Sequence, residues 1–162
     1  MKGIVYTLGA LHDGECALAG QWAEAAARHS AEHEVRHVAQ ILLGWSNEHG
    51  RRLADAGARY GLALDPPPEP GPRGLPPADE EGTLAEEHPA EEGLLLLLDL
   101  RELHLGACGN SLLWEMLGQV AQASGESSLL DLATSCHPRT LRQMRWTNTM
   151  LKSLSPQVLT SL

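Results

Sequence analysis

Phenylalanine is missing from this 162-residue chain, and aromatic residues of all kinds make up only 4% of it. Because strands favour aromatic and β-branched side chains, this scarcity argues against a fold built on sheets. The apolar residues, 43% of the chain, are mainly leucine and alanine, which favour helices. The length is enough for one domain, spanning 1–162, with a real core. We therefore expect a single all-α domain.

Positive charge is also scarce. The chain has 12 Lys and Arg residues against 21 Asp and Glu, which gives a formal net charge of −9. Nucleic acids and anionic membrane surfaces are bound through basic patches. We therefore expect neither a nucleic acid nor a membrane as a partner.

Cysteine is limited to Cys16, Cys108 and Cys136, and no CxxC motif occurs. An odd, widely spaced set is not a disulfide framework. The N-terminus has no signal-peptide pattern, and the longest apolar run, at 93–98, is too short to span a bilayer. We predict a cytoplasmic protein. The thiols are either small buried apolar groups or part of a soft-metal or redox site.

Proline divides the chain into three zones. Residues 3–61 contain none, residues 65–90 are rich in it, and residues 91–155 are again leucine-rich. This pattern predicts helices at about 5–29, 31–60, 90–123 and 127–153. Ser30 is expected as an N-cap, Gly61 as the residue that ends the second helix, and Pro138 as a kink or a late start in the fourth.

The proline-rich segment at 65–90 is long enough to cross the full length of a helical bundle. Short loops within each hairpin and one long connection between them predict a four-helix bundle made of two antiparallel hairpins.

One ionisable residue falls on the apolar stripe that 3–4 spacing defines in each expected helix. The stripes are Leu8, Leu11, Glu15, Leu18 and Trp22; then Val38, Leu42, Trp45, His49 and Leu53; then Leu95, Leu98, Glu102, Leu105, Gly109, Leu112 and Met116; then Leu130, Ala133, His137, Thr140 or Leu141, and Met144. Antiparallel pairing places Glu15 level with His49, and Glu102 level with His137. The four groups are expected to converge, either around a divalent cation or as structural ion pairs.

In this order of Glu, His, Glu and His, the chain resembles the ferritin-like, rubrerythrin-like carboxylate proteins, whose bundles carry a Glu and then a Glu-x-x-His in each hairpin. Glu15 and Glu102 match the lone glutamates, and His49 and His137 match the histidines. Ser46 and Thr134 stand where the family has its bridging glutamates. The resemblance implies a degenerate site for one ion of iron, manganese or zinc.

Two functions remain open from the sequence. The first is a metal-binding protein with Glu15, His49, Glu102 and His137 as ligands and no organic cofactor; its reaction is not indicated. The second is a metal-free helical bundle that acts as an interaction or scaffold protein, a pseudo-enzyme remnant of a di-iron protein. A homodimer is expected in either case. Glu48 and Glu115 are alternative inward-facing carboxylates, and the surface histidines around His33 are more typical of a solvated face.

Overall fold

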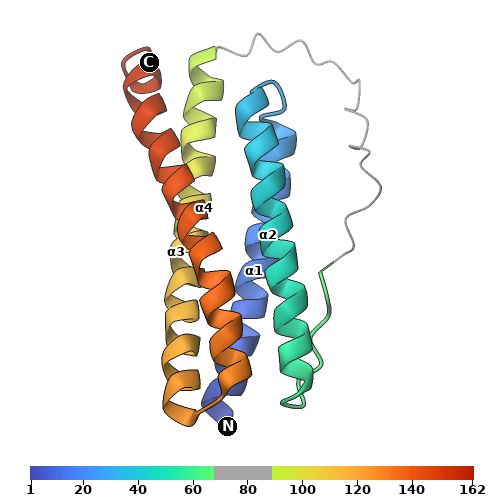
Figure 1. The fold of residues 1–162 in the computed structure, drawn as a ribbon. Coiled ribbons are helices and arrows are strands. Elements are labelled where there is room, and N and C mark those ends of the chain that lie inside the picture. The colour runs from blue at the N-terminus through green and yellow to red at the C-terminus, as the bar shows by residue number, and fades with distance from the viewer. Residues whose placement is uncertain (68–88) are drawn as a thin grey trace.

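A computed structural model describes residues 1–67 and 89–162 of the chain (Figure 1). These residues form four α-helices, which are α1 (Lys2–Arg28), α2 (His33–Ala58), α3 (Pro89–Ser124) and α4 (Ser127–Leu159). Neither described range contains a strand. The all-α prediction is confirmed. The proline-rich connection predicted at 65–90 lies almost entirely outside the described residues.

The four helices pack together as a bundle, in which α1 lies against α2 and α3, and α3 lies against α4. Figure 1 shows α1 antiparallel to α2 and α3 antiparallel to α4, while α2 and α3 run in the same direction. Side chains confirm this order, because Val35 near the start of α2 packs with Leu96 and Leu100 near the start of α3. None of the described helices has the length and apolar character that a membrane span requires.

Two glycines close helix ends in the same way. Gly61, with φ of 77°, follows α2, and Gly125, with φ of 72°, joins α3 to α4. After α2, the N–H of Leu62 donates to the carbonyl of Gly57 at 3.0 Å, which is the bond that defines a Schellman cap. The roles predicted for Gly61 and for the break at 124–127 are confirmed.

Two predicted boundaries differ from the structure, the start of α2 and the end of α4. Glu32, not Ser30, is the N-cap of α2, and it makes no side-chain cap bond. Helix α4 begins at Ser127, as predicted, so Pro138 does not delay its start. The helix continues through both Pro138 and Pro156 and ends at Leu159, not at 153. A proline removes one helical N–H donor, and the contacts of α4 with its neighbours outweigh that loss.

The apolar stripes predicted for α1 and α2 are confirmed, since their members are buried or half-buried in the bundle. The stripe predicted for α3 is wrong, because Leu95, Leu98, Leu105, Leu112 and Met116 are all exposed. The residues of α3 that enter the core are Leu96, Leu97, Leu100, Leu103, Ala107, Trp114, Leu117 and Ala121. Leucines on several faces of this helix make its apolar pattern ambiguous.

The stripe predicted for α4 is confirmed at Ala133 and at Thr140, the alternative to Leu141, but it is displaced by one position at Leu130, His137 and Met144. Cys136 is fully buried there and His137 is only half-buried. Three further core positions of α4 are polar, namely Thr140, Gln143 and Thr147. A search for apolar spacing therefore passes over the face that this helix presents to the core.

Candidate functional site

Glu15 of α1 and His49 of α2 form a pair at the centre of the bundle. Both side chains are fully buried, and His49 Nδ1 lies 3.1 Å from Glu15 Oε1. Antiparallel packing of α1 on α2 places the two residues at one level, as the sequence predicted. Removing two ionisable groups from water costs several kcal/mol unless they compensate one another. The contact between Glu15 and His49 provides that compensation.

Trp114 of α3 completes the arrangement. Its indole N–H donates to the same Glu15 oxygen at 3.0 Å, and its ring meets the His49 ring edge-on with centroids 5.6 Å apart. Three helices thus contribute to one buried cluster. From the sequence, Trp114 is expected only to pack in the core or on a dimer surface, not to join a polar cluster. The available signal was its place on a stripe with Ala107, Asn110 and Leu117.

His49 is more basic than an ordinary histidine. Burial by itself lowers its pKa, but the hydrogen bond with Glu15, the charge on Glu15 and the proximity of Cys136 outweigh burial and raise the pKa to about 9. The imidazole is therefore protonated at neutral pH, and the pair consists of an imidazolium and a carboxylate. A protonated imidazole cannot bind a metal until it loses a proton.

The core around this pair is unusually polar. Gln143 of α4 is fully buried and donates to Ser46 Oγ at 3.0 Å and to the carbonyl of Leu42 at 3.1 Å. Several buried atoms have no hydrogen-bond partner; they include Glu15 Oε2, His49 Nε2, Asn110 Nδ2, Thr140 Oγ1 and Gln143 Oε1. Buried polar atoms of this kind call for ordered water or a ligand. All four helices contribute to this polar layer.

Glu102 does not join the pair. Its side chain is 58% exposed and accepts a hydrogen bond from the neighbouring Arg101 at 2.5 Å. The residue borders a shallow groove between α1 and α3 that Gln21, Glu24 and Arg28 also line. The prediction that Glu102 lies on the core-facing stripe is wrong, because the stripe that contains it faces outward.

His137 does not join the pair either. Its Nε2 bonds to Ser111 Oγ of α3 at 2.8 Å, and its Nδ1 lies 3.8 Å from the Glu115 carboxylate. It is half-buried at the margin between α3 and α4, one residue away from the core position that Cys136 occupies. The predicted convergence of four groups is therefore reduced to two, Glu15 and His49.

The two alternative carboxylates also face outward. Glu48 pairs with Arg139 of α4 at 2.5 Å, and this hydrogen bond holds the pKa of Glu48 below its ordinary value. Arg139 in turn lies over the Trp45 ring, 5.7 Å from its centroid. Glu115 is exposed and accepts a hydrogen bond from Gln119. Glu48 therefore helps to join α2 to α4 rather than lining the core.

The three cysteines are all free thiols, and they lie apart in the bundle. Burial, followed by the charges of Asp13 and Glu15, raises the pKa of Cys16. Cys136 contacts His49 and accepts a hydrogen bond from Arg52 at 3.4 Å. Within 1–67 and 89–162, no three His, Cys, Asp or Glu side chains are grouped so as to hold a metal ion.

The histidines around His33, at the turn between α1 and α2, lie in two different environments. His29 is buried against Asp99 of α3, with Nε2 2.6 Å from the carboxylate, and Arg28 donates to the same carboxylate. His33 and His37 remain exposed on α2. His29 thus fixes α1 to α3, and only the other two present a solvated face.

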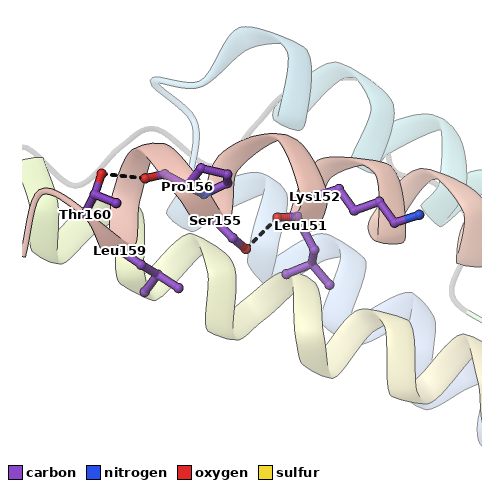
Figure 2. Close-up of a pocket in the computed structure, with 6 residues that line it drawn as sticks. All are labelled: Leu151, Lys152, Ser155, Pro156, Leu159 and Thr160. Atoms are coloured by element: carbon purple, nitrogen blue, oxygen red, sulfur yellow. Dashed lines mark hydrogen bonds between the residues drawn. The ribbon is translucent and has the colours of Figure 1, made fainter.

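A groove near the C-terminal end of α4 is lined by Leu151, Lys152, Ser155, Pro156, Leu159 and Thr160 (Figure 2). The Ser155 hydroxyl donates to the Leu151 carbonyl at 2.5 Å, and the Thr160 hydroxyl to the Pro156 carbonyl at 2.6 Å. Both hydroxyls are thus engaged by the backbone of their own helix. The groove offers mainly apolar contact and the Lys152 ammonium, which is a weak basis for a ligand site.

A row of exposed apolar side chains runs along α3. We define the outer face of α3 as the exposed stripe of Leu95, Leu98, Glu102, Leu105, Gly109, Leu112 and Met116. Leu112 is 68% exposed, and Leu98, Leu105 and Met116 are each 50% exposed. Single exposed leucines are ordinary, but an apolar row along one helix is typical of an interaction surface.

Comparison with known proteins identifies no relative. No family model matches the chain, and no curated protein or solved structure matches it either. The functional argument therefore depends on the residues and the geometry described above.

Proposed function

We propose that this chain is a helical-bundle interaction protein that binds a protein partner through the outer face of α3. The observation that carries this proposal is the row of exposed leucine and methionine side chains between Leu95 and Met116. Water contact with such a row is unfavourable by about 25 cal/mol for each Å² of apolar surface. Covering the row with a partner recovers that free energy.

The buried cluster has a structural role in this proposal. The Glu15–His49 ion pair and the Trp114 hydrogen bond connect α1, α2 and α3 in one arrangement. Ser46, which stands where ferritin-like proteins carry a bridging glutamate, accepts a hydrogen bond from Gln143 instead. A ferritin-like origin remains part of the proposal, supported by the helix order and directions, and the chain would then be a remnant that has lost its bridging ligands.

Site-specific photo-crosslinking tests the interaction surface. A photoreactive amino acid replaces Leu105 on the outer face of α3, and in a matched control it replaces Leu141 of α4. The two leucines are similarly exposed, at 50% and 46%. We expect an adduct of defined mass from residue 105 only, identified by mass spectrometry and lost when Leu112→Glu is added. If residues 105 and 141 give the same products in the producing cells, the proposed function is wrong.

Divalent metal binding is a second candidate, favoured by the unpartnered Glu15 Oε2 and His49 Nε2 atoms in the core. Cys136, which contacts His49, would be the nearest further donor. Iron, manganese or zinc would polarise a bound molecule there, while Glu15 held the His49 ring in orientation. Elemental analysis of tag-free protein purified without chelator tests this candidate. Metal at one ion per chain, lost in His49→Gln but kept in the exposed control His33→Gln, would establish it.

A further inference from the structure

The outer face of α3 has the residue spacing of a helix that pairs with another helix. Its seven members recur at alternating intervals of three and four residues, which is the pattern of a coiled-coil seam, and five of them have apolar side chains. One turn from Leu105 lies Gly109, and a Cβ built there would meet nothing within 4 Å. Glycine within a helix costs up to about 1 kcal/mol relative to alanine. Among the described residues nothing packs on Gly109, which leaves room there for a leucine from a facing helix.

Charges beside this face specify an orientation. Arg101 and Glu115 lie seven residues before and seven residues after Cys108, on the same edge of the outer face, and both are exposed. In a parallel pair of identical helices, Arg101 and Glu115 would face the other edge of the second helix, at Gly106 and Val120, and find no opposite charge there. In an antiparallel pair centred on this segment, Arg101 meets Glu115 of the second copy twice.

We propose that the outer face of α3 binds a second copy of this chain, with the two α3 helices antiparallel and the twofold axis near Cys108. Leu105 of each copy then packs over Gly109 of the other, and Leu98 meets Met116. Glu102 interrupts the seam, and its carboxylate is already held by Arg101. This inference rests on the proposed function, because it names the partner of that same face.

Sedimentation velocity over a range of concentrations tests the dimer and its register. We expect wild type to dimerise and Leu105→Glu to weaken dimerisation by roughly tenfold or more. Leu141→Glu, on α4, is the matched control and should leave the dimer unchanged. Arg101→Glu should also weaken the dimer, since it places like charges opposite each other. The charge-reversed double variant Arg101→Glu/Glu115→Arg should restore it.

Thiol cross-linking tests the position of the axis. In a Cys16→Ser background the accessible thiol is Cys108, because Cys136 is fully buried. A short bismaleimide should join two chains through Cys108. Moving the cysteine with Cys108→Ser/Arg101→Cys should abolish the cross-link, because antiparallel helices would place those two thiols about 21 Å apart. In a parallel pair the two positions would have the same separation from their copies, so both would cross-link or neither would.

The outcomes separate this inference from the proposed function. A chain that stays monomeric at all concentrations, or a dimer that survives Leu105→Glu, overturns the inference. So does failure of the charge-reversed double variant to recover the dimer. A specific adduct from residue 105 with a different protein would retain the proposed function and overturn the second copy as its partner. Absence of any specific adduct together with a monomeric chain overturns both.

Discussion

His49 carries a charge that depends on its two neighbours, Glu15 and Cys136. In the folded protein its pKa is raised to about 9, against an ordinary value of 6.5. Below pH 6.5 both folded and unfolded chains hold the proton, so the stabilisation is fully present. Between pH 6.5 and 9 the folded chain holds more protons than the unfolded chain. The free energy of unfolding must then fall as pH rises.

We therefore predict that stability decreases from pH 6.5 to pH 9 by as much as about 1.4 kcal/mol per pH unit, the limit for one proton. Urea unfolding at intervals between pH 6 and 9.5 measures this slope. His49→Gln lacks the titrating group and should lose that part of the slope. Equal slopes in the two proteins would show that His49 is not held in its charged form.

A double-mutant cycle measures how strongly the pair is coupled. Glu15→Gln alone leaves a buried imidazolium without its counter-charge and should cost about 3–5 kcal/mol. Glu15→Gln/His49→Gln replaces both charges with amides and should cost less than the two single changes added together, by at least about 1 kcal/mol. Chemical denaturation at pH 7 provides all four values. Additive losses would mean that the two side chains stabilise the fold independently.

Among individual residues, Glu15 and His49 could be predicted from the sequence because their helices have one clear apolar face each. Glu102 and His137 could not be placed correctly, and the reason lies in their helices. Leucines occur around much of α3, so its chain does not specify which leucines face inward. The core face of α4 includes Gln143 and Thr147, which an apolar pattern does not reveal. Trp114 and Cys136, rather than Glu102 and His137, lie next to Glu15 and His49.

Helix α3 offers a direct test of its orientation in the bundle. Leu117 is fully buried, whereas Leu112 is 68% exposed. We predict that Leu117→Ala costs about 2–5 kcal/mol of stability, as core leucine truncations do. Leu112→Ala should change it by less than about 0.5 kcal/mol, measured at a concentration where sedimentation shows monomers. Reversed magnitudes would mean that the originally expected stripe, which includes Glu102, faces the core.

The packing of α1 on α3 depends on a close approach at Gly14. A Cβ placed there would lie 2.2 Å from Asn110 Oδ1, and Asn110 is buried with little room to turn. Gly14→Ala should therefore destabilise the protein by about 1–3 kcal/mol. Gly9→Ala in the same helix meets nothing within 4 Å and should stabilise it by up to about 1 kcal/mol. Thermal unfolding of both variants makes the comparison. A similar shift in both would remove the steric argument.

For the whole molecule, the sequence was sufficient to predict four helices and the glycine that closes α2, because proline and glycine positions are local signals. It was not sufficient to predict which face of α3 remains outside, because that depends on how α1 and α4 share the core. The same Leu98, Leu105 and Leu112 that the spacing assigned to the core became the exposed row. The apolar pattern thus detected the row that we propose as an interaction surface, but it assigned that row to the core side of α3.

Native mass spectrometry of tag-free protein, purified without chelator or added metal, tests the central claim directly, because one spectrum reports both assembly and bound metal. We predict a species at twice the 17.5 kDa chain mass with no metal adduct, converted to monomer by Leu105→Glu. This result would support a bundle whose core pair is structural and whose outer face of α3 binds a partner. A monomer that carries one metal ion, lost in His49→Gln, would contradict the account.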